Sequence, residues 1–253
     1  MFRLRTLAIA GCILAIGTFF VHAQDDDLKA VLRKSMAAHG GEKNLGKFKA
    51  VTTKFKGTME IQGLTFDITG ETSLQKPDKV KNVLKMEIKG KTIDVVTVLT
   101  PKKLYVWDSI TSMTKDIDDE KILKGAREEL QAEGASSFAD FVKAPYELSA
   151  IGEVKVKGKD AIGIRISKKG QKDISMFFDK KTYLVVKSEM RTIDGMSGQE
   201  VTTEKFINSY QEKAGMKIAR KVEIVKDGKV FMDIEIIEVQ PLEKLDDSVF
   251  AKP

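Results

Sequence analysis

The sequence contains very little of the chemistry that most enzyme sites need. Its 253 residues include one cysteine, Cys12, and two histidines, His22 and His39. No Gly-x-Ser-x-Gly elbow, Walker-type phosphate loop or dinucleotide-binding glycine motif is found along the chain. We therefore expect no enzyme: no catalytic residue, no metal and no cofactor. A hydrolase that uses His39 as its base is the enzymatic alternative.

The first 23 residues have the organisation of an export signal. Arg3 and Arg5 form a basic start, and the apolar run from Leu7 to Val21 is too short for a stable membrane span. Val21-His22-Ala23 then supplies small residues for cleavage. Loss of residues 1–23 would remove the cysteine and one histidine, which excludes a disulfide, a thiolate nucleophile and a zinc site of cysteine and histidine ligands.

Cleavage there would leave residues 24–253, which suits one large β domain in the periplasm with no transmembrane span. Two alternatives stay open. Ile9-Ala10-Gly11-Cys12 has the form of a lipoprotein signal, which would leave a lipid anchor on Cys12, and the apolar run could also persist as an uncleaved anchor.

Charge is nearly balanced in the predicted mature chain. Removal of two arginines lowers the formal net charge from +6 to +4. Lysines occur mostly within alternating stretches, as at Lys54 and Lys56, so a solvated sheet face is favoured over a patch for nucleic acid or anionic lipid. We expect no nucleic-acid partner.

The stretch from Val51 to Gln75 alternates apolar and polar residues on both sides of Gly63. A period of two over so many residues predicts two long, half-buried antiparallel strands joined by a turn. Similar stretches follow to residue 99 and again from Tyr146 nearly to the end, with a hairpin signal at Asp227-Gly228. We count about ten to twelve strands.

Two regions instead show the helical period. In the first, from Asp25 to Ala38, the apolar stripe is preceded by Asp25, Asp26 and Asp27, which are placed to cap a helix start. In the second, between Asp116 and Val142, Asp118 and Asp119 stand before a narrow apolar stripe. That stripe consists of Ile122, Leu123, Ala126 and Leu130. The acidic clusters are better explained as helix starts than as calcium sites.

These patterns predict a mainly β protein with helices, of the α+β class. An antiparallel sheet of this size tends to curl or close. The mid-chain helix must rest on the sheet, either by ordinary packing or as a lid over a cavity. Several of the ten methionines alternate with other apolar residues, which suits a cavity for acyl chains but also an ordinary core.

Three segments resemble LolA-like proteins, the superfamily of bacterial outer-membrane lipoprotein carriers. They are His39-Gly40-Gly41 with Leu45 and Phe48-Lys49 before the long hairpin, the stretch from Phe178 to Lys187, and the closing segment from Leu245 to Pro253. The resemblance implies an incomplete antiparallel β-barrel, covered by the N-terminal helix and the mid-chain helical lid, around an apolar cavity that receives lipid tails.

The expected function is therefore a periplasmic carrier or binding protein for a lipid or lipoprotein acyl chain, with envelope proteins as further partners. The predicted cavity residues are Phe55, Met59, Phe66, Ile68, Leu84, Met86, Leu123, Leu130, Met176 and Phe178. The alternative is a structural envelope protein in which the same side chains form a filled core.

Overall fold

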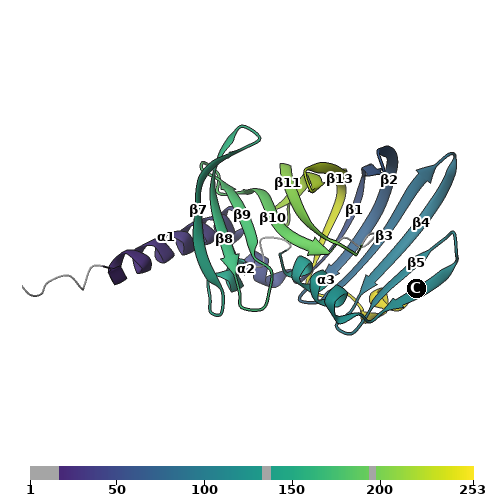
Figure 1. Ribbon diagram of the computed structural model, residues 1–253, viewed down its shortest axis with the longest axis horizontal. Helices are drawn as coiled ribbons and strands as arrows, with labels where there is room; N and C mark the ends of the chain where they lie inside the picture. Colours follow the sequence, from purple (N-terminus) through teal and green to yellow (C-terminus); the bar gives the residue numbers. More distant parts are fainter. Residues whose placement is uncertain (1–16, 133–137, 194–197) are drawn as a thin grey trace, which may run out of the picture.

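The computed structural model describes residues 17–132, 138–193 and 198–253, and it folds them around one antiparallel sheet (Figure 1). Its strands are β1 (Ala50–Ile61), β2 (Leu64–Gln75), β3 (Lys79–Ile88), β4 (Lys91–Leu99), β5 (Leu104–Asp108), β6 (Met113–Ile117), β7 (Glu147–Val156), β8 (Lys159–Ser167), β9 (Ile174–Asp179), β10 (Val185–Ile193), β11 (Glu200–Lys213), β12 (Met216–Lys226) and β13 (Lys229–Leu242). The helices are α1 (Gly17–Ala38), α2 (Gly41–Lys47), α3 (Glu120–Ala132), α4 (Phe138–Phe141) and the 3-10 helix η2 (Asp247–Phe250). Arg3, Arg5 and Cys12 lie outside the described residues.

The spatial order of the strands is β6-β5-β4-β3-β2-β1-β13-β12-β11-β10-β9-β8-β7. The chain thus starts at the middle of the sheet, runs outward to the β6 edge, crosses through α3 and α4 to the β7 edge, and returns to the middle. The first and last strands are partners, with Met59 opposite Met232. The result is an open, curled sheet rather than a closed barrel (Figure 1).

The described residues form thirteen strands, more than the predicted ten to twelve. β6 has no clear apolar alternation because it is a short edge strand with the sequence Met-Thr-Lys-Asp-Ile. β11 is long but mostly polar. Both are held by backbone pairing to a neighbour, a contribution that leaves little trace in side-chain periodicity.

The opening hairpin is confirmed. β1 and β2 pair in register from Ala50 opposite Gln75 to Ile61 opposite Leu64, and Gln62 and Gly63 make the turn with φ angles of 53° and 78°. Asp227 and Gly228 also adopt positive φ between β12 and β13. Two positive φ values match the tight turns that join twisted antiparallel strands.

The helix α1 begins at Gly17, so the prediction that Asp25, Asp26 and Asp27 cap its start is wrong for the full chain. Residues 17–24 contain no proline and continue the helix upstream of the acidic triplet. Asp119 does cap α3: its Oδ1 accepts hydrogen bonds from the backbone N–H groups of Lys121 and Ile122 at 2.8 and 3.1 Å. No helix in the described ranges is both long and apolar enough to cross a bilayer.

The helices α1, α3 and α4 pack on one face of the sheet, called the inner face below. Two parts of it differ. The covered arm is β7–β10, against which α1 and α4 pack. The open arm is β1–β4 with β13, where α3 reaches only the strand ends far from the β1–β2 turn (Figure 1).

Candidate functional site

A continuous apolar surface occupies the open arm at the end near the β1–β2 turn. We call it the apolar floor; it consists of Phe55, Met59, Ile61, Phe66, Ile68, Leu84, Met86, Ile88, Phe231, Met232, Ile234 and Ile236. All twelve come from β1, β2, β3 and β13, and no helix residue in the described ranges belongs to the set. Phe55, Met59, Ile68 and Met86 are buried, and the others are half-buried.

Within the floor, a glycine makes room for the aromatic ring of Phe55. Gly70 on β2 stands opposite Phe55 on β1, and a Cβ at Gly70 would lie 2.4 Å from Phe55 Cζ. The ring therefore lies over the neighbouring strand instead of standing upright. At the β1–β2 turn, Leu64 lies on the same face opposite Ile61 and is 63% exposed.

A row of polar side chains crosses the inner face beyond the floor. Thr53, Thr72, Asn82 and Thr97 are directly paired on β1, β2, β3 and β4. The Thr72 hydroxyl donates to Asn82 Oδ1 at 2.8 Å. This polar row separates the floor from the apolar cluster under α3.

In that second cluster, Leu123 and Leu130 of α3 are buried against the sheet. Their partners are Leu74, Val80, Leu99 and Leu104, which belong to β2–β5. The predicted stripe therefore does rest on the inner face. It covers one end of the open arm and not the floor itself.

The covered arm is packed by the protein's own side chains. Phe178 and Met176 are 0% and 2% exposed and lie in one cluster with Leu32 of α1 and Phe138 and Phe141 of α4. The rings of Phe138 and Phe178 meet edge to face at 5.9 Å between centroids. These interior side chains form a filled core.

The ten predicted cavity residues thus fall into three groups. Six of them, Phe55, Met59, Phe66, Ile68, Leu84 and Met86, come together on the apolar floor. Leu123 and Leu130 anchor α3, and Met176 and Phe178 belong to the covered arm. Sequence alternation alone did not separate the floor from the covered arm, because the strand residues of both share the same pattern.

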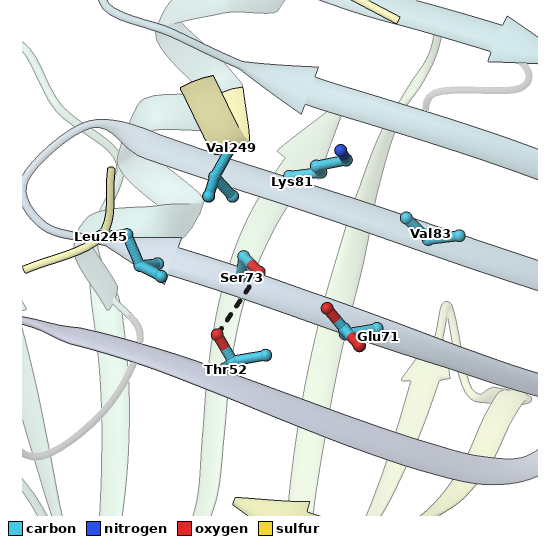
Figure 2. A pocket seen from close by; sticks show the side chains of 7 residues that line it. All are labelled: Thr52, Glu71, Ser73, Lys81, Val83, Leu245 and Val249. Atoms are coloured by element: carbon cyan, nitrogen blue, oxygen red, sulfur yellow. Dashed lines mark hydrogen bonds between the residues drawn. The ribbon is translucent and has the colours of Figure 1, made fainter. Parts of the chain in front are cut away.

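Two pockets are formed elsewhere, and neither is lined by any of the ten. One, of about 310 Å³, lies on the face opposite the floor (Figure 2). There Glu71 and Lys81 of β2 and β3 lie beside Leu245 and Val249 of the C-terminal segment. That segment is held by Lys79, whose Nζ is 2.8 Å from Asp247 Oδ1.

The other pocket, of about 220 Å³, lies between α3, the β8–β9 loop and the end of β10. We call it the α3 pocket. Its charged lining residues are Lys121, Lys124, Glu128, Lys172, Arg191 and Glu200. Sequence reasoning missed it, although Lys121, Lys124 and Glu128 recur at helical spacing and mark a second, charged stripe on α3.

His39 is buried where α1 ends against β11. Its Nδ1 lies 2.8 Å from the Ser35 carbonyl oxygen and its Nε2 3.3 Å from the Tyr210 hydroxyl, which donates to the Val185 carbonyl at 2.6 Å. Burial lowers the pKa of His39, opposed by the Ser35 contact, so the neutral ring is favoured over the cation. With Nδ1–H committed to a carbonyl, Nδ1 is not free to act as a base toward the Ser35 hydroxyl.

Within the described ranges, no group of three or more His, Cys, Asp or Glu side chains is placed to hold a metal ion. Asp119 is occupied as the α3 cap, and Asp26 and Asp27 are exposed on α1. The absence of a metal or catalytic site remains a prediction from the sequence.

Comparison with solved structures defines the class of this fold. A DUF1329 family protein from Desulfovibrio piger aligns with a TM-score of 0.56 at 13% identity, over 88% of this chain and 96% of that one. A protein described as an outer membrane lipoprotein-sorting protein domain, from Vibrio parahaemolyticus, aligns at 0.53 and 11%, over 89% and 97%. A LolA superfamily protein from Nitrosomonas europaea aligns at 0.53 and 10%, over 88% and 97%.

The chain therefore has a LolA-like fold, as the resemblance in its sequence predicts. At these identities the likeness concerns the fold alone. No protein-family model matches the sequence, and a search of curated proteins gives no match.

Proposed function

We propose that this protein is a periplasmic carrier or binding protein for a lipid or lipoprotein acyl chain, held without covalent chemistry on the apolar floor. One observation carries the proposal: twelve apolar side chains of four strands form one cluster on the inner face that no described helix residue joins. Phe55, Met59, Phe66, Ile68, Leu84 and Met86 are the proposed contacts. The LolA-like fold and the lipoprotein-sorting description of one structural neighbour support it.

The floor supplies enough driving force for such a ligand. Burial of an acyl chain contributes about 0.8 kcal/mol for each methylene removed from water. A chain that covers Leu64, which is 63% exposed, would also remove apolar protein surface from water. Hydrophobic burial then provides the affinity, and no reaction is required.

In this proposal the other predicted residues support the site without lining it. Leu123 and Leu130 anchor α3 to the sheet beyond the polar row, and Met176 and Phe178 pack in the core of the covered arm. Periplasmic location follows the predicted signal over residues 1–23. An envelope protein that delivers or receives the lipid is part of the proposal.

A measurement of lipid retention tests the proposed carrier function. Protein purified from membranes in mild detergent is examined by native mass spectrometry, and we expect bound lipid in the wild type. Phe66→Glu places a charge on the floor and should reduce retention at least about tenfold, because an unpaired charge beside an acyl chain is costly. Thr65→Glu, on the opposite face of the same strand, is the matched control and should retain wild-type levels.

The filled core of the covered arm favours one alternative, a structural envelope protein that binds no ligand. It predicts lipid-free wild-type protein and equal behaviour of the two variants. That outcome would contradict the carrier proposal.

A further inference from the structure

The α3 pocket is small and strongly charged, unlike the apolar floor. Its volume of about 220 Å³ is below the roughly 300 Å³ at which pockets for drug-sized molecules begin. Four basic and two acidic side chains line it, a formal surplus of two positive charges. A small group that carries negative charge fits this size and sign.

Two of the four basic side chains share one carboxylate, that of Glu200. Lys172 Nζ hydrogen-bonds to Glu200, and Arg191 Nη2 lies 2.8 Å from Glu200 Oε2. One carboxylate thus serves two cations, which leaves the cluster positive. Lys121 and Lys124 extend from α3 on the other side of the pocket. Convergent ammonium and guanidinium groups are the usual ligands of phosphate.

Glu128 adds a buried hydrogen-bond acceptor to the pocket. This residue is 7% exposed, and its Oε2 accepts a long hydrogen bond of 3.3 Å from the backbone N–H of Lys172. Its Oε1 is 3.8 Å from Lys124 Nζ and has no hydrogen-bond partner among the described residues. A buried carboxylate oxygen without a donor is costly, so the pocket is suited to a ligand that brings an N–H group.

We propose that the α3 pocket binds a zwitterionic headgroup with a phosphate and a primary ammonium, as in phosphoethanolamine. The basic side chains take the phosphate, and Glu128 accepts a hydrogen bond from the ammonium. This assignment rests on the proposed lipid-binding function and gives it a substrate class, an aminophospholipid.

The sheet connects this pocket to the floor. Thr192, in the pocket wall on β10, shares the inner face with the floor on β1, four strands away in the order β10-β11-β12-β13-β1. At roughly 4.8 Å between neighbouring strands, these four steps measure about 19 Å across the sheet. One acyl chain spans one leaflet, about half of the roughly 30 Å bilayer core, so it covers about three of these steps and reaches the part of the floor on β13. Met190, Val222 and Ile234 present apolar side chains on this face, and β11 contributes Thr203 and Lys205 between Met190 and β12.

The test offers the purified protein vesicles with equal amounts of phosphatidylethanolamine, phosphatidylcholine and phosphatidylglycerol that carry identical acyl chains. Choline has the positive charge but no N–H donor, and glycerol lacks the positive charge. We expect the re-isolated wild type to be enriched about tenfold in phosphatidylethanolamine over phosphatidylcholine, the ratio expected for one charge-assisted hydrogen bond.

Glu128→Gln should bring that ratio to about one, because it removes the carboxylate that accepts from the ammonium. Glu129→Gln is the matched control, because Glu129 is the next residue on α3, contacts Lys205 and does not line the pocket. A ratio near one in the wild type, a preserved preference in Glu128→Gln, or an equal loss in both variants would overturn the assignment.

Calorimetry with soluble glycerophosphoethanolamine and glycerophosphocholine separates the headgroup site from the acyl site. Lipid retention without headgroup preference and without soluble-headgroup binding would overturn the assignment and leave the carrier function intact. Binding of glycerophosphoethanolamine that Glu128→Gln abolishes, in a protein that retains no lipid, would uphold the assignment and contradict the acyl site.

Discussion

The two arms of the sheet are built from the same alternating pattern and have different surroundings. On the covered arm, Phe178 and Ile164 are fully buried beneath α1 and α4. On the open arm, Phe66 and Leu84 stay half-buried because no described helix residue packs on them. An apolar strand face thus becomes filled core where helices pack on it, whereas only four of the twelve floor side chains, Phe55, Met59, Ile68 and Met86, are buried.

The comparison of the two arms predicts that the largest loss of stability follows a substitution on the covered arm. Phe178→Ala should lower the free energy of unfolding by about 3–5 kcal/mol, because it leaves a cavity in a filled core. Urea denaturation followed by circular dichroism measures the change. Bound lipid per folded molecule should stay unchanged. If this variant lost lipid while it kept its stability, Phe178 would belong to the binding surface.

On the open arm we expect the reverse, a smaller loss of stability together with a loss of bound lipid. Phe66→Ala should cost less stability, about 1–2 kcal/mol, because the ring is already half exposed to solvent. The same denaturation experiment compares it with Phe178→Ala, and native mass spectrometry should show reduced lipid retention. An equal stability loss in both variants would remove the distinction between the arms.

A smaller loss of stability is expected from the N-terminal cap of α3. Asp119→Ala removes the oxygen that accepts from Lys121 and Ile122 N–H, and should lower the free energy of unfolding by about 1 kcal/mol. Asp119→Asn keeps an acceptor and should recover most of this loss. Fraying of the first turn of α3 can be followed by amide hydrogen exchange at these two residues. Unchanged protection there would contradict the capping role.

The smallest effect at neutral pH is expected from His39. Burial lowers its pKa below the ordinary value of 6.5, so the unfolded chain binds a proton more readily than the folded one. Its contribution to stability is complete above about pH 6.5 and is lost as the pH falls through the lowered pKa. His39→Gln should reduce the slope of stability against pH in that acid range. An unaltered slope would show that the ring is not held neutral.

Local chemistry made much of this fold predictable. The hairpin around Gly63 and the turn at Asp227-Gly228 follow from alternation and from residues that tolerate positive φ. β6 and β11 were harder to predict because backbone pairing holds them. The split of the predicted site could not be predicted, since it depends on which strands α1, α3 and α4 cover. The α3 pocket needs loop and helix residues brought together by the tertiary fold.

The pairing of the first strand with the last has a consequence for synthesis. Residue Met59 meets Met232 only after nearly the whole sheet has been made. Until then β1 is a free edge beside an apolar face, a combination that favours pairing with other chains. Closing so long a loop is also slow. β13, which completes the open arm, therefore also removes the free edge through which β1 could pair with other chains. A chain that stops before β13 should be the most aggregation-prone form of this protein.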